Sequence, residues 1–255
     1  MSDADARRIA GALNFRDVGV LPAAGGATRP GVLFRSGNLA RLDENDRGAL
    51  RALGIRRIVD LRADDEVAFE PSLLDGLDVE TVRAPLFLGS TASFFAEDVP
   101  LREMYRLLVD TASERIVEVV RAVIGAQPVL VHCTVGKDRT GVTVALMLAA
   151  VGVDRDAIVA DYARTETLLP AGRNERVVAY LRSRHPEAQH IEELATLSPA
   201  PVMHAFLDDV TERFGSAAGY LRAHGVTEEE LVLLRAALIA PNGDAGGGGG
   251  NASSR

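Results

Sequence analysis

The stretch that most constrains the fold is PVLVHCTVGKDRTGVTVALMLAAVGV, residues 128–153. Residues 128–132 are an apolar run of strand length, which is typical of a parallel sheet buried on both faces. Residues 141–153 are apolar over the length of a helix, and they are too few to cross a bilayer, which takes roughly 20 residues. We therefore predict a buried strand, a short loop and a buried helix, with the loop at the sheet edge where α/β folds bind ligands.

The rest of the chain alternates strands and helices through residue 153 and is helical afterwards. Asp43 and Gly54 are the expected N-cap and stop of a helix, and Thr227 with Glu230 forms a capping box before the last one. Strands are expected at 32–37, 55–62 and 79–86, a helix at 42–54, and one or two helices at 97–125. The pattern predicts an α/β fold, with a central, mostly parallel sheet flanked by helices and a helical C-terminal half.

The domain organisation is simple. A chain of 255 residues can bury one large core, and we expect a single domain over residues 1–240. Gly and Ser dominate the segment from Pro241 onward, PNGDAGGGGGNASSR, so residues 241–255 are expected to be a disordered tail.

Composition narrows the range of functions that this chain could have. The net charge of −8 argues against a general nucleic-acid binder, which needs a basic face. The single cysteine cannot form an internal disulfide, and no signal peptide is visible, so we expect a cytoplasmic protein without stable membrane insertion. Export without a signal peptide stays open. Neither a metal nor another cofactor is expected, because no ligand spacing connects His185, His190, His204 and His224.

The single cysteine, Cys133, lies in the loop between the predicted strand and helix. Backbone N–H groups of such a loop can converge, with Gly136 supplying conformational freedom, and the positive end of the helix adds to an anion site. Arg139 offers a guanidinium matched to phosphate oxygens, and Lys137 adds a second positive charge. A thiol in these surroundings ionises readily and becomes a nucleophile. An inert core cysteine beside a surface arginine is the alternative, but it leaves the surrounding strand, glycine and helix unexplained.

The segment HCTVGKDRTG, residues 132–141, resembles the signature loop of cysteine-dependent protein tyrosine phosphatases, H-C-x5-R-[S/T]. Its Gly-Lys-Asp-Arg form resembles an atypical bacterial subgroup, similar to mycobacterial tyrosine phosphatase B. The resemblance covers most of residues 10–240. After NFRD this sequence has Val-Gly where the family usually has Gly-Gly, and we expect this difference to have no effect on function. Four shorter segments support it: NFRDVG at 14–19, LFRSGNL at 33–39, IVDLR at 58–62 and DY at 161–162.

The resemblance implies a mechanism without metal, in which Cys133 attacks phosphorus and Arg139 clamps the phosphate. Thr140 would donate its hydroxyl to the sulfur, and His132 would orient the loop and help to keep the thiolate. Lys137 would favour highly anionic substrates, including phosphoinositides, although a solvated charge is its other interpretation. The implied substrate-binding residues are His132, Thr134, Val135, Gly136, Lys137 and Thr140.

The proton donor to the leaving group is a choice between two carboxylic acids. The resemblance favours Asp138, inside the loop. Asp60 is the alternative, because it ends a predicted strand and strand ends face the site. Asp60 could instead form a salt bridge with Arg62 or Arg16.

Four residues outside the loop are candidates to support it. Asn14, Arg16 and Asp17 could hold the loop from behind, although Asn and Asp are also common in turns. Arg35 could likewise hold the loop, or pair with a surface acid.

These features predict hydrolysis of phosphotyrosine, and also of phosphoserine or phosphothreonine, through a phosphocysteine on Cys133. The expected partner is a phosphorylated protein or a phosphoinositide. A phosphoinositide or inositol-phosphate phosphatase is the rival enzyme, and a phosphotyrosine-binding pseudoenzyme is the rival binder, although a binder would be expected to lack Cys133 or Arg139. A sulfurtransferase does not need the Lys-Asp-Arg-Thr ending, and an arsenate reductase needs further cysteines.

Overall fold

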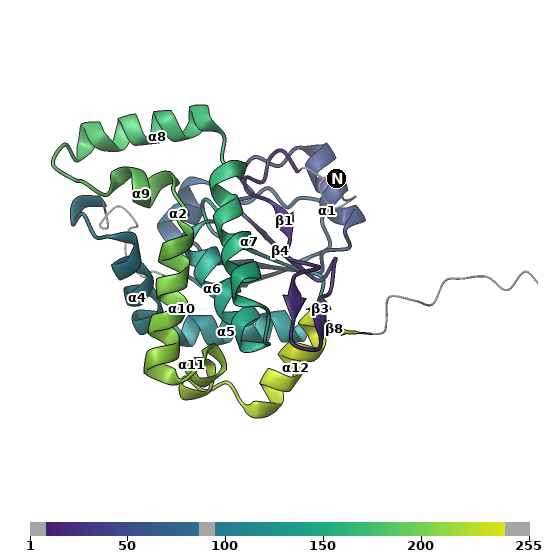
Figure 1. Ribbon diagram of the computed structural model, residues 1–255. Helices are drawn as coiled ribbons and strands as arrows, with labels where there is room; N and C mark the ends of the chain where they lie inside the picture. The colour runs from purple at the N-terminus through teal and green to yellow at the C-terminus, as the bar shows by residue number, and fades with distance from the viewer. Residues whose placement is uncertain (1–8, 87–94, 243–255) are drawn as a thin grey trace, which may run out of the picture.

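The computed structural model describes residues 9–86 and 95–242, which form a central sheet with helices on both faces (Figure 1). The strand order is β1, β4, β7, β5, β6. β4, β7, β5 and β6 are parallel, whereas β1 runs antiparallel to β4 at one edge. The predicted mostly parallel sheet is therefore confirmed. In sheet order the strands span Arg16–Asp17, Leu33–Ser36, Val129–His132, Arg57–Asp60 and Glu80–Arg83.

The central strand, β7, is buried along its whole length. Val129 and Val131 point into the larger core, while Leu130 joins Phe34 and Ile58 in the smaller core on the other face. Successive side chains of a strand point to opposite faces, so a strand covered on both sides is apolar at every position. That is why the sequence shows an uninterrupted apolar run here.

Helices cover the two faces unequally. On the larger side, α6 packs against α4, α5, α7 and α11, and α7 lies beside α10 (Figure 1). α1 contributes to the smaller core through Leu50. α2 follows the carboxyl end of β5, and α8 packs on α9. The helices span Glu44–Ala52 (α1), Asp64–Phe69 (α2), Leu101–Thr111 (α4), Ser113–Gly125 (α5), Asp138–Ala150 (α6), Arg155–Leu168 (α7), Ala171–Arg184 (α8), Ile191–Thr196 (α9), Ala200–Phe214 (α10), Ala217–Ala223 (α11) and Glu228–Leu238 (α12).

The predicted helix signals are confirmed. Asp43 caps α1 by accepting a hydrogen bond from the amide of Asp46, and Gly54 follows that helix with a φ of 65°. Thr227 and Glu230 form the expected capping box of α12. The segment expected to hold one or two helices, 97–125, holds two, α4 and α5.

A second, small sheet joins the two ends of the described chain. It consists of β2 (Pro22–Ala23), β3 (Gly26–Thr28) and β8 (Ile239–Pro241). Pro241 pairs with Gly26, and the amide of Asn242 donates to the carbonyl of Gly25. Pro241 and Asn242 therefore belong to the folded part of the chain, contrary to the expectation that the tail begins at Pro241. The remainder of the expected tail, 243–255, lies outside the described residues.

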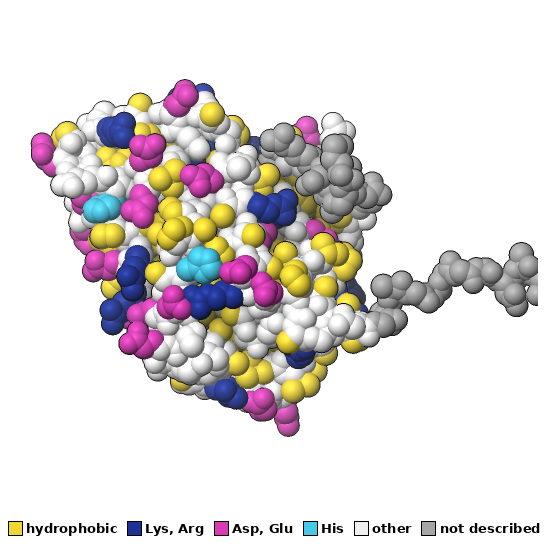
Figure 2. All heavy atoms as spheres, in the orientation of Figure 1, with side chains coloured by type: hydrophobic (Ala, Val, Ile, Leu, Met, Phe, Trp, Pro, Cys, Tyr) yellow, Lys and Arg dark blue, Asp and Glu magenta, His cyan; other side chains and the backbone are white. Residues whose placement is uncertain are grey.

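Within the described part of the chain, no helix is long and apolar enough to span a bilayer. On the face shown in Figure 2, arginine and lysine side chains are interspersed with acidic ones, so this face is not a continuous basic surface.

The small sheet leads to a test of the chain's end. Deleting residues 243–255 should leave the melting temperature unchanged, because Gly/Ser-rich sequence contributes little burial. Deleting residues 239–255 should cost about 2 kcal/mol or more, roughly 4–8 °C in melting temperature, because it removes the buried Ile239 and the pairing with β3. Calorimetry of the two truncated proteins measures their melting temperatures. Equal values would show that β8 contributes nothing to the stability of the fold.

Candidate active site

The cysteine loop connects the end of β7 at His132 to the start of α6 at Asp138, three residues before the apolar stretch 141–153 in which a helix was expected. Gly136 has a φ of 74°, and a Cβ atom there would lie 2.4 Å from the carbonyl carbon and oxygen of Ser36. Only glycine fits this close approach. The amide of Gly136 then donates to Cys133 Sγ at 3.2 Å, and the sulfur is almost fully buried.

The loop is held from outside through its carbonyl groups. The carbonyl oxygen of Gly136 accepts from Asn14 Nδ2 at 2.8 Å and from an Arg35 guanidinium nitrogen at 3.0 Å. The carbonyl of Thr134 accepts from the amide of Asn38 at 3.0 Å. The supporting roles predicted for Asn14 and Arg35 therefore match the observed contacts.

A buried carboxylate, Asp161 on α7, organises these supports. It binds Arg16 Nε and an Arg35 terminal nitrogen, each at 2.7 Å, and all three side chains are at most 4% exposed. Burial alone would raise the pKa of Asp161, but the two guanidiniums lower it. Burial and the neighbouring Arg35 lower the pKa of Arg16 to about 10, although Asp161 opposes this shift. Arg16 also donates to the side chain of Asn14, so the predicted support by Arg16 is indirect.

Asp17 does not contact the cysteine loop or the ion pairs around Asp161. Its carboxylate accepts from the amides of Gly19 at 2.9 Å and Gly31 at 2.6 Å, and it therefore fixes a turn. Burial raises its pKa, against the lowering effect of these amides. The expectation that Asp17 supports the loop is wrong, and turn formation, which its residue type favours, explains it instead.

Arg139, in the first turn of α6, is paired with Glu66 of α2. Its two terminal nitrogens contact the two carboxylate oxygens at 2.5 and 2.8 Å, and Thr134 Oγ1 donates to the same carboxylate. Burial alone would raise the pKa of Glu66, but Arg139, Thr134 and the amide of Ala63 lower it to about 2. The pKa of Arg139 is raised, because the hydrogen bonds and charge of Glu66 and the electrostatic interaction with Cys133 outweigh the effect of burial.

Asp138 lies beside Arg139 and is the more accessible carboxylic acid. Its side chain is 21% exposed, and its Oδ1 accepts from Tyr105 of α4 at 2.8 Å and from Lys137 Nζ at 2.7 Å. Lys137 is 1% exposed, and its ammonium also donates to the carbonyls of Leu197 at 2.8 Å and Glu193 at 3.4 Å. The solvated charge considered for Lys137 is wrong, because burial against α9 gives the ammonium three partners inside the protein.

Asp60, the alternative acid, forms ion pairs with two arginines. Both its oxygens accept from Arg62, at 3.0 and 2.8 Å, and Arg83 lies 3.0 Å from Oδ2. Burial would raise its pKa, but Arg62 and His132 lower it. Asp60 is therefore a carboxylate without a proton to donate, and of the two partners expected for it, Arg62 is found while Arg16 pairs elsewhere.

His132 lies beneath the loop and is fully buried. Its Nδ1 is 3.4 Å from the carbonyl oxygen of Cys133, and its Nε2 is 3.8 Å from Asp60. Burial lowers the pKa of His132 to about 4, despite the opposing carboxylate. The neutral, enclosed ring can orient the loop, but it is not a substrate contact and cannot stabilise the thiolate by charge.

The hydrogen bond expected from Thr140 to the sulfur is not formed. The hydroxyl oxygen is buried, and it has no hydrogen-bond partner among the described residues. Thr134 and Val135, like Asp138, are partly exposed, whereas Cys133, Gly136 and Lys137 are buried.

Sequence reasoning missed Glu66, Asp161 and Tyr105. Asp161 belongs to the DY segment that carried part of the resemblance, but no local pattern gave it a role. Glu66 could have been found, because it lies just beyond the end of β5, next to the cysteine loop. No sequence pattern indicated a role for Tyr105, because its contact with Asp138 depends on how α4 packs against α6.

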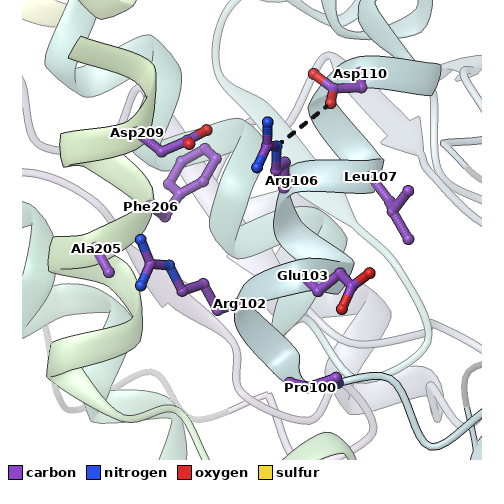
Figure 3. Close-up of a pocket in the computed structure, with 9 residues that line it drawn as sticks. All are labelled: Pro100, Arg102, Glu103, Arg106, Leu107, Asp110, Ala205, Phe206 and Asp209. Atoms are coloured by element: carbon purple, nitrogen blue, oxygen red, sulfur yellow. Dashed lines mark ion pairs between the residues drawn. The ribbon is translucent and has the colours of Figure 1, made fainter. Parts of the chain in front are cut away.

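A separate cavity of about 500 Å³ lies between α4 and α10 (Figure 3). Phe206 lies at its wall, and the ring of Phe206 also contacts the ring of Tyr105. None of the predicted site residues lines this cavity, so it is distinct from the cysteine loop.

A parallel strand, a cysteine loop closed by glycine and an arginine at the start of the next helix define the class of cysteine-dependent phosphatases. The chain belongs to the tyrosine phosphatase family, whose sequence model matches residues 7–240. This membership confirms the predicted enzyme class.

Curated relatives extend over most of the chain. It is 34% identical to the triple specificity protein phosphatase PtpB of Mycobacterium tuberculosis, over 91% of this chain and 99% of that protein. It is 31% identical to a tyrosine-protein phosphatase of Nostoc commune, over 80% of this chain and 73% of that protein. Among solved structures, P. aeruginosa TpbA is 20% identical with a TM-score of 0.36, covering 69% of this chain and 94% of that one.

The Glu66–Arg139 pair predicts a pH-dependent contribution to stability. The pKa of Glu66 is depressed to about 2, so the pair stabilises the fold above the unfolded pKa near 4.5, and this contribution is lost as the pH falls toward 2. Glu66→Gln should cost on the order of 1–2 kcal/mol at pH 6, because partial exposure screens the pair, and the difference from wild type should shrink by pH 3. Urea denaturation at the two pH values measures it.

A matched control is Glu80→Gln, which breaks a surface pair with Arg57. This variant should differ little from wild type at either pH. A Glu66→Gln variant that stays equally far below wild type at pH 6 and pH 3 would contradict the ionic origin of the effect.

Proposed function

We propose that this chain hydrolyses phosphotyrosine, and secondarily phosphoserine and phosphothreonine, in proteins through a phosphocysteine on Cys133. The observation that carries the proposal is the sulfur at the base of a loop whose Gly136 amide points at it, with Arg139 held at the loop's end. Family membership and the relatives named as protein phosphatases support it.

In the first step, the Cys133 thiolate attacks phosphorus as the bond from phosphorus to the ester oxygen breaks. Loop amides and the guanidinium of Arg139 neutralise the phosphate oxygens. Asp138 gives its proton to the departing oxygen, so the product leaves as a neutral phenol or alcohol. The products of this step are phosphocysteine and an Asp138 carboxylate.

In the second step, water attacks the phosphocysteine. Asp138 takes a proton from that water, the sulfur–phosphorus bond breaks, and inorganic phosphate and the thiolate are released. Asp138 is therefore acid first and base second, and the enzyme returns to its starting state without a redox partner.

Glu66 supports the role of Arg139 by fixing the plane of its guanidinium. A bidentate carboxylate restricts a long side chain to one orientation, which prepares it for a phosphate. The hydroxyl of Thr134 bonds to the same carboxylate, so the opening of the loop and the arginine are held together.

The rival hypothesis, that the chain is a phosphoinositide phosphatase, has lost its main support. It depended on Lys137 as a cation offered to extra phosphates, and the ammonium of Lys137 is instead bound to Asp138 and to the carbonyl groups around α9. We propose a phosphoprotein as the substrate, and the cytoplasm as its compartment, since a single reactive cysteine suits a reducing environment.

The nucleophile is tested with a phosphotyrosyl peptide. Cys133→Ser should lower turnover by more than about 10³-fold while still binding the peptide, because the hydroxyl is a poor nucleophile in an intact anion site. Phosphate release and peptide affinity are measured side by side, with a chelator added to wild type as a control that should change nothing. Substantial turnover by Cys133→Ser would exclude the mechanism, and a clear preference for a phosphoinositide over the peptide would exclude the proposed substrate.

The proton donor is tested with a series of aryl phosphates. Asp138→Asn should slow phosphotyrosine about 10²–10⁴-fold and slow esters of acidic phenols much less, because good leaving groups need little protonation. Asp60→Asn should instead lower stability and slow all esters equally, because it frees the buried Arg62. The reverse pattern would assign the acid to Asp60.

A further inference from the structure

The two oxygens of the Asp138 carboxyl group are in different surroundings. Oδ1 accepts two hydrogen bonds, from Tyr105 at 2.8 Å and from Lys137 at 2.7 Å. Oδ2 accepts no hydrogen bond from any described residue. A carboxyl oxygen has two lone pairs, so Oδ1 is saturated, and a proton on this group must be carried by Oδ2.

The hydrogen bond from Tyr105 has a defined direction. A tyrosine has one proton, and that of Tyr105 is used toward Asp138. The hydroxyl of Tyr162, 2.7 Å from that of Tyr105, must then be the donor to the Tyr105 oxygen. These hydrogen bonds run from Tyr162 of α7 through Tyr105 of α4 to Asp138 of α6. They link three helices at one carboxyl oxygen.

Packing fixes the two tyrosine rings. They are 0% and 1% exposed, and they meet edge to face with centroids 6.2 Å apart. The ring of Tyr105 also meets the ring of Phe206 edge to face, at 6.0 Å. A Cβ atom at Gly141 would lie 3.1 Å from the ring of Tyr162, so the glycine in the first turns of α6 makes room for it.

Both hydroxyls stay protonated. Burial, followed by the charge of Asp138, raises the pKa of Tyr105 and of Tyr162 well above the usual value. They therefore act as permanent donors, and neither is suited to deliver a proton itself.

We propose that Tyr105, supported by Tyr162, is the positioning residue of the general acid: it holds Asp138 Oδ1 and thereby reserves Oδ2 for the proton given to the leaving group. This inference rests on the proposed function, in which Asp138 is the acid. During the first step the proton passes from Oδ2 to the ester oxygen as the phosphorus–oxygen bond breaks. The carboxylate left behind keeps the hydrogen bonds of Tyr105 and Lys137 at Oδ1. In the second step Oδ2 receives the proton of the attacking water.

The test is Tyr105→Phe, which keeps the ring and removes only the hydroxyl. Loss of one hydrogen bond to an ionisable group should lower kcat roughly 5- to 30-fold for phosphotyrosine and phenyl phosphate, with KM little changed. For the phosphate ester of a strongly acidic phenol, kcat should fall less than about 3-fold, because its departure needs little protonation. Tyr162→Phe should give the same pattern with a smaller amplitude, and it replaces Tyr105→Phe if that variant does not fold.

The matched control is Tyr220→Phe. Tyr220 is also fully buried and also bonds to α4, through the carbonyl of Val109 at 2.8 Å, but it has no contact with Asp138. Any general effect of losing a buried hydroxyl at α4 should appear in this variant, equally for all leaving groups. The melting temperatures of the three variants show whether stability is comparable.

A double mutant separates this inference from the proposed function. Adding Tyr105→Phe to Asp138→Asn should change rates by less than about 2-fold, because a positioning residue acts only through the group it positions. If Asp138→Asn shows leaving-group dependence but Tyr105→Phe slows all esters equally, or its effect adds in full to that of Asp138→Asn, the role of Tyr105 is overturned while the function stands. If Asp138→Asn itself shows no leaving-group dependence, this inference falls together with the assignment of Asp138 as the acid, whereas hydrolysis through Cys133 is decided separately by Cys133→Ser.

Discussion

The hydrogen bonds to the carbonyl oxygen of Gly136 are the interactions on which the site depends. Glycine at a positive φ imposes no conformation, because it lacks the side chain that would restrict the backbone. The loop must therefore be fixed by its surroundings, and Asn14 and Arg35 do this by donating to that oxygen. Asn14 Nδ2 also contacts the carbonyl oxygen of Val135 at 3.4 Å, and this carbonyl belongs to the same peptide unit as the Gly136 amide that faces Cys133. The geometry needed for catalysis is thus set by contacts on the far side of the loop.

The buried charges around the loop serve geometry more than stability. A buried ion pair gains little net free energy, because desolvation offsets most of the attraction, yet removing one partner costs about 3–5 kcal/mol for fully buried pairs such as those of Asp161, and less for the partly exposed pair of Arg139 and Glu66. Asp161 is shared by Arg16 and Arg35, and Arg139 is matched by Glu66. Each pair has one low-cost arrangement, so the network makes alternative loop positions unfavourable. This specifies a single loop conformation before any substrate is bound.

The sequence was most informative where structure is local. A strand, a glycine loop and a helix follow one another within residues 128–153, so their pattern predicted Cys133 and Arg139 at a sheet edge, and the caps of α1 and α12 were equally visible. Glu66 and Tyr105 lie 73 and 33 residues before their partners Arg139 and Asp138, respectively. Their contacts arise from how α2 and α4 pack, which no local periodicity encodes. The role of Lys137 was misjudged for a related reason: its position in the chain was clear, but the direction of its side chain depends on α9.

The C-terminal helices are part of the site rather than a cover for it. α7 supplies Asp161, which binds the loop supports Arg16 and Arg35, and Tyr162, which bonds to Tyr105 beside Asp138, the proposed general acid. The end of α9 offers carbonyl groups to Lys137, and cations are favoured at the negative end of a helix. Without these helices, Arg35 would lose Asp161, Lys137 would lose the carbonyls of Glu193 and Leu197, and Tyr105 would lose Tyr162, so the groups around the loop would no longer be fixed. This mutual dependence is the physical argument for treating sheet and C-terminal helices as one domain, in which the chemistry of one loop is fixed by helices from both halves of the chain.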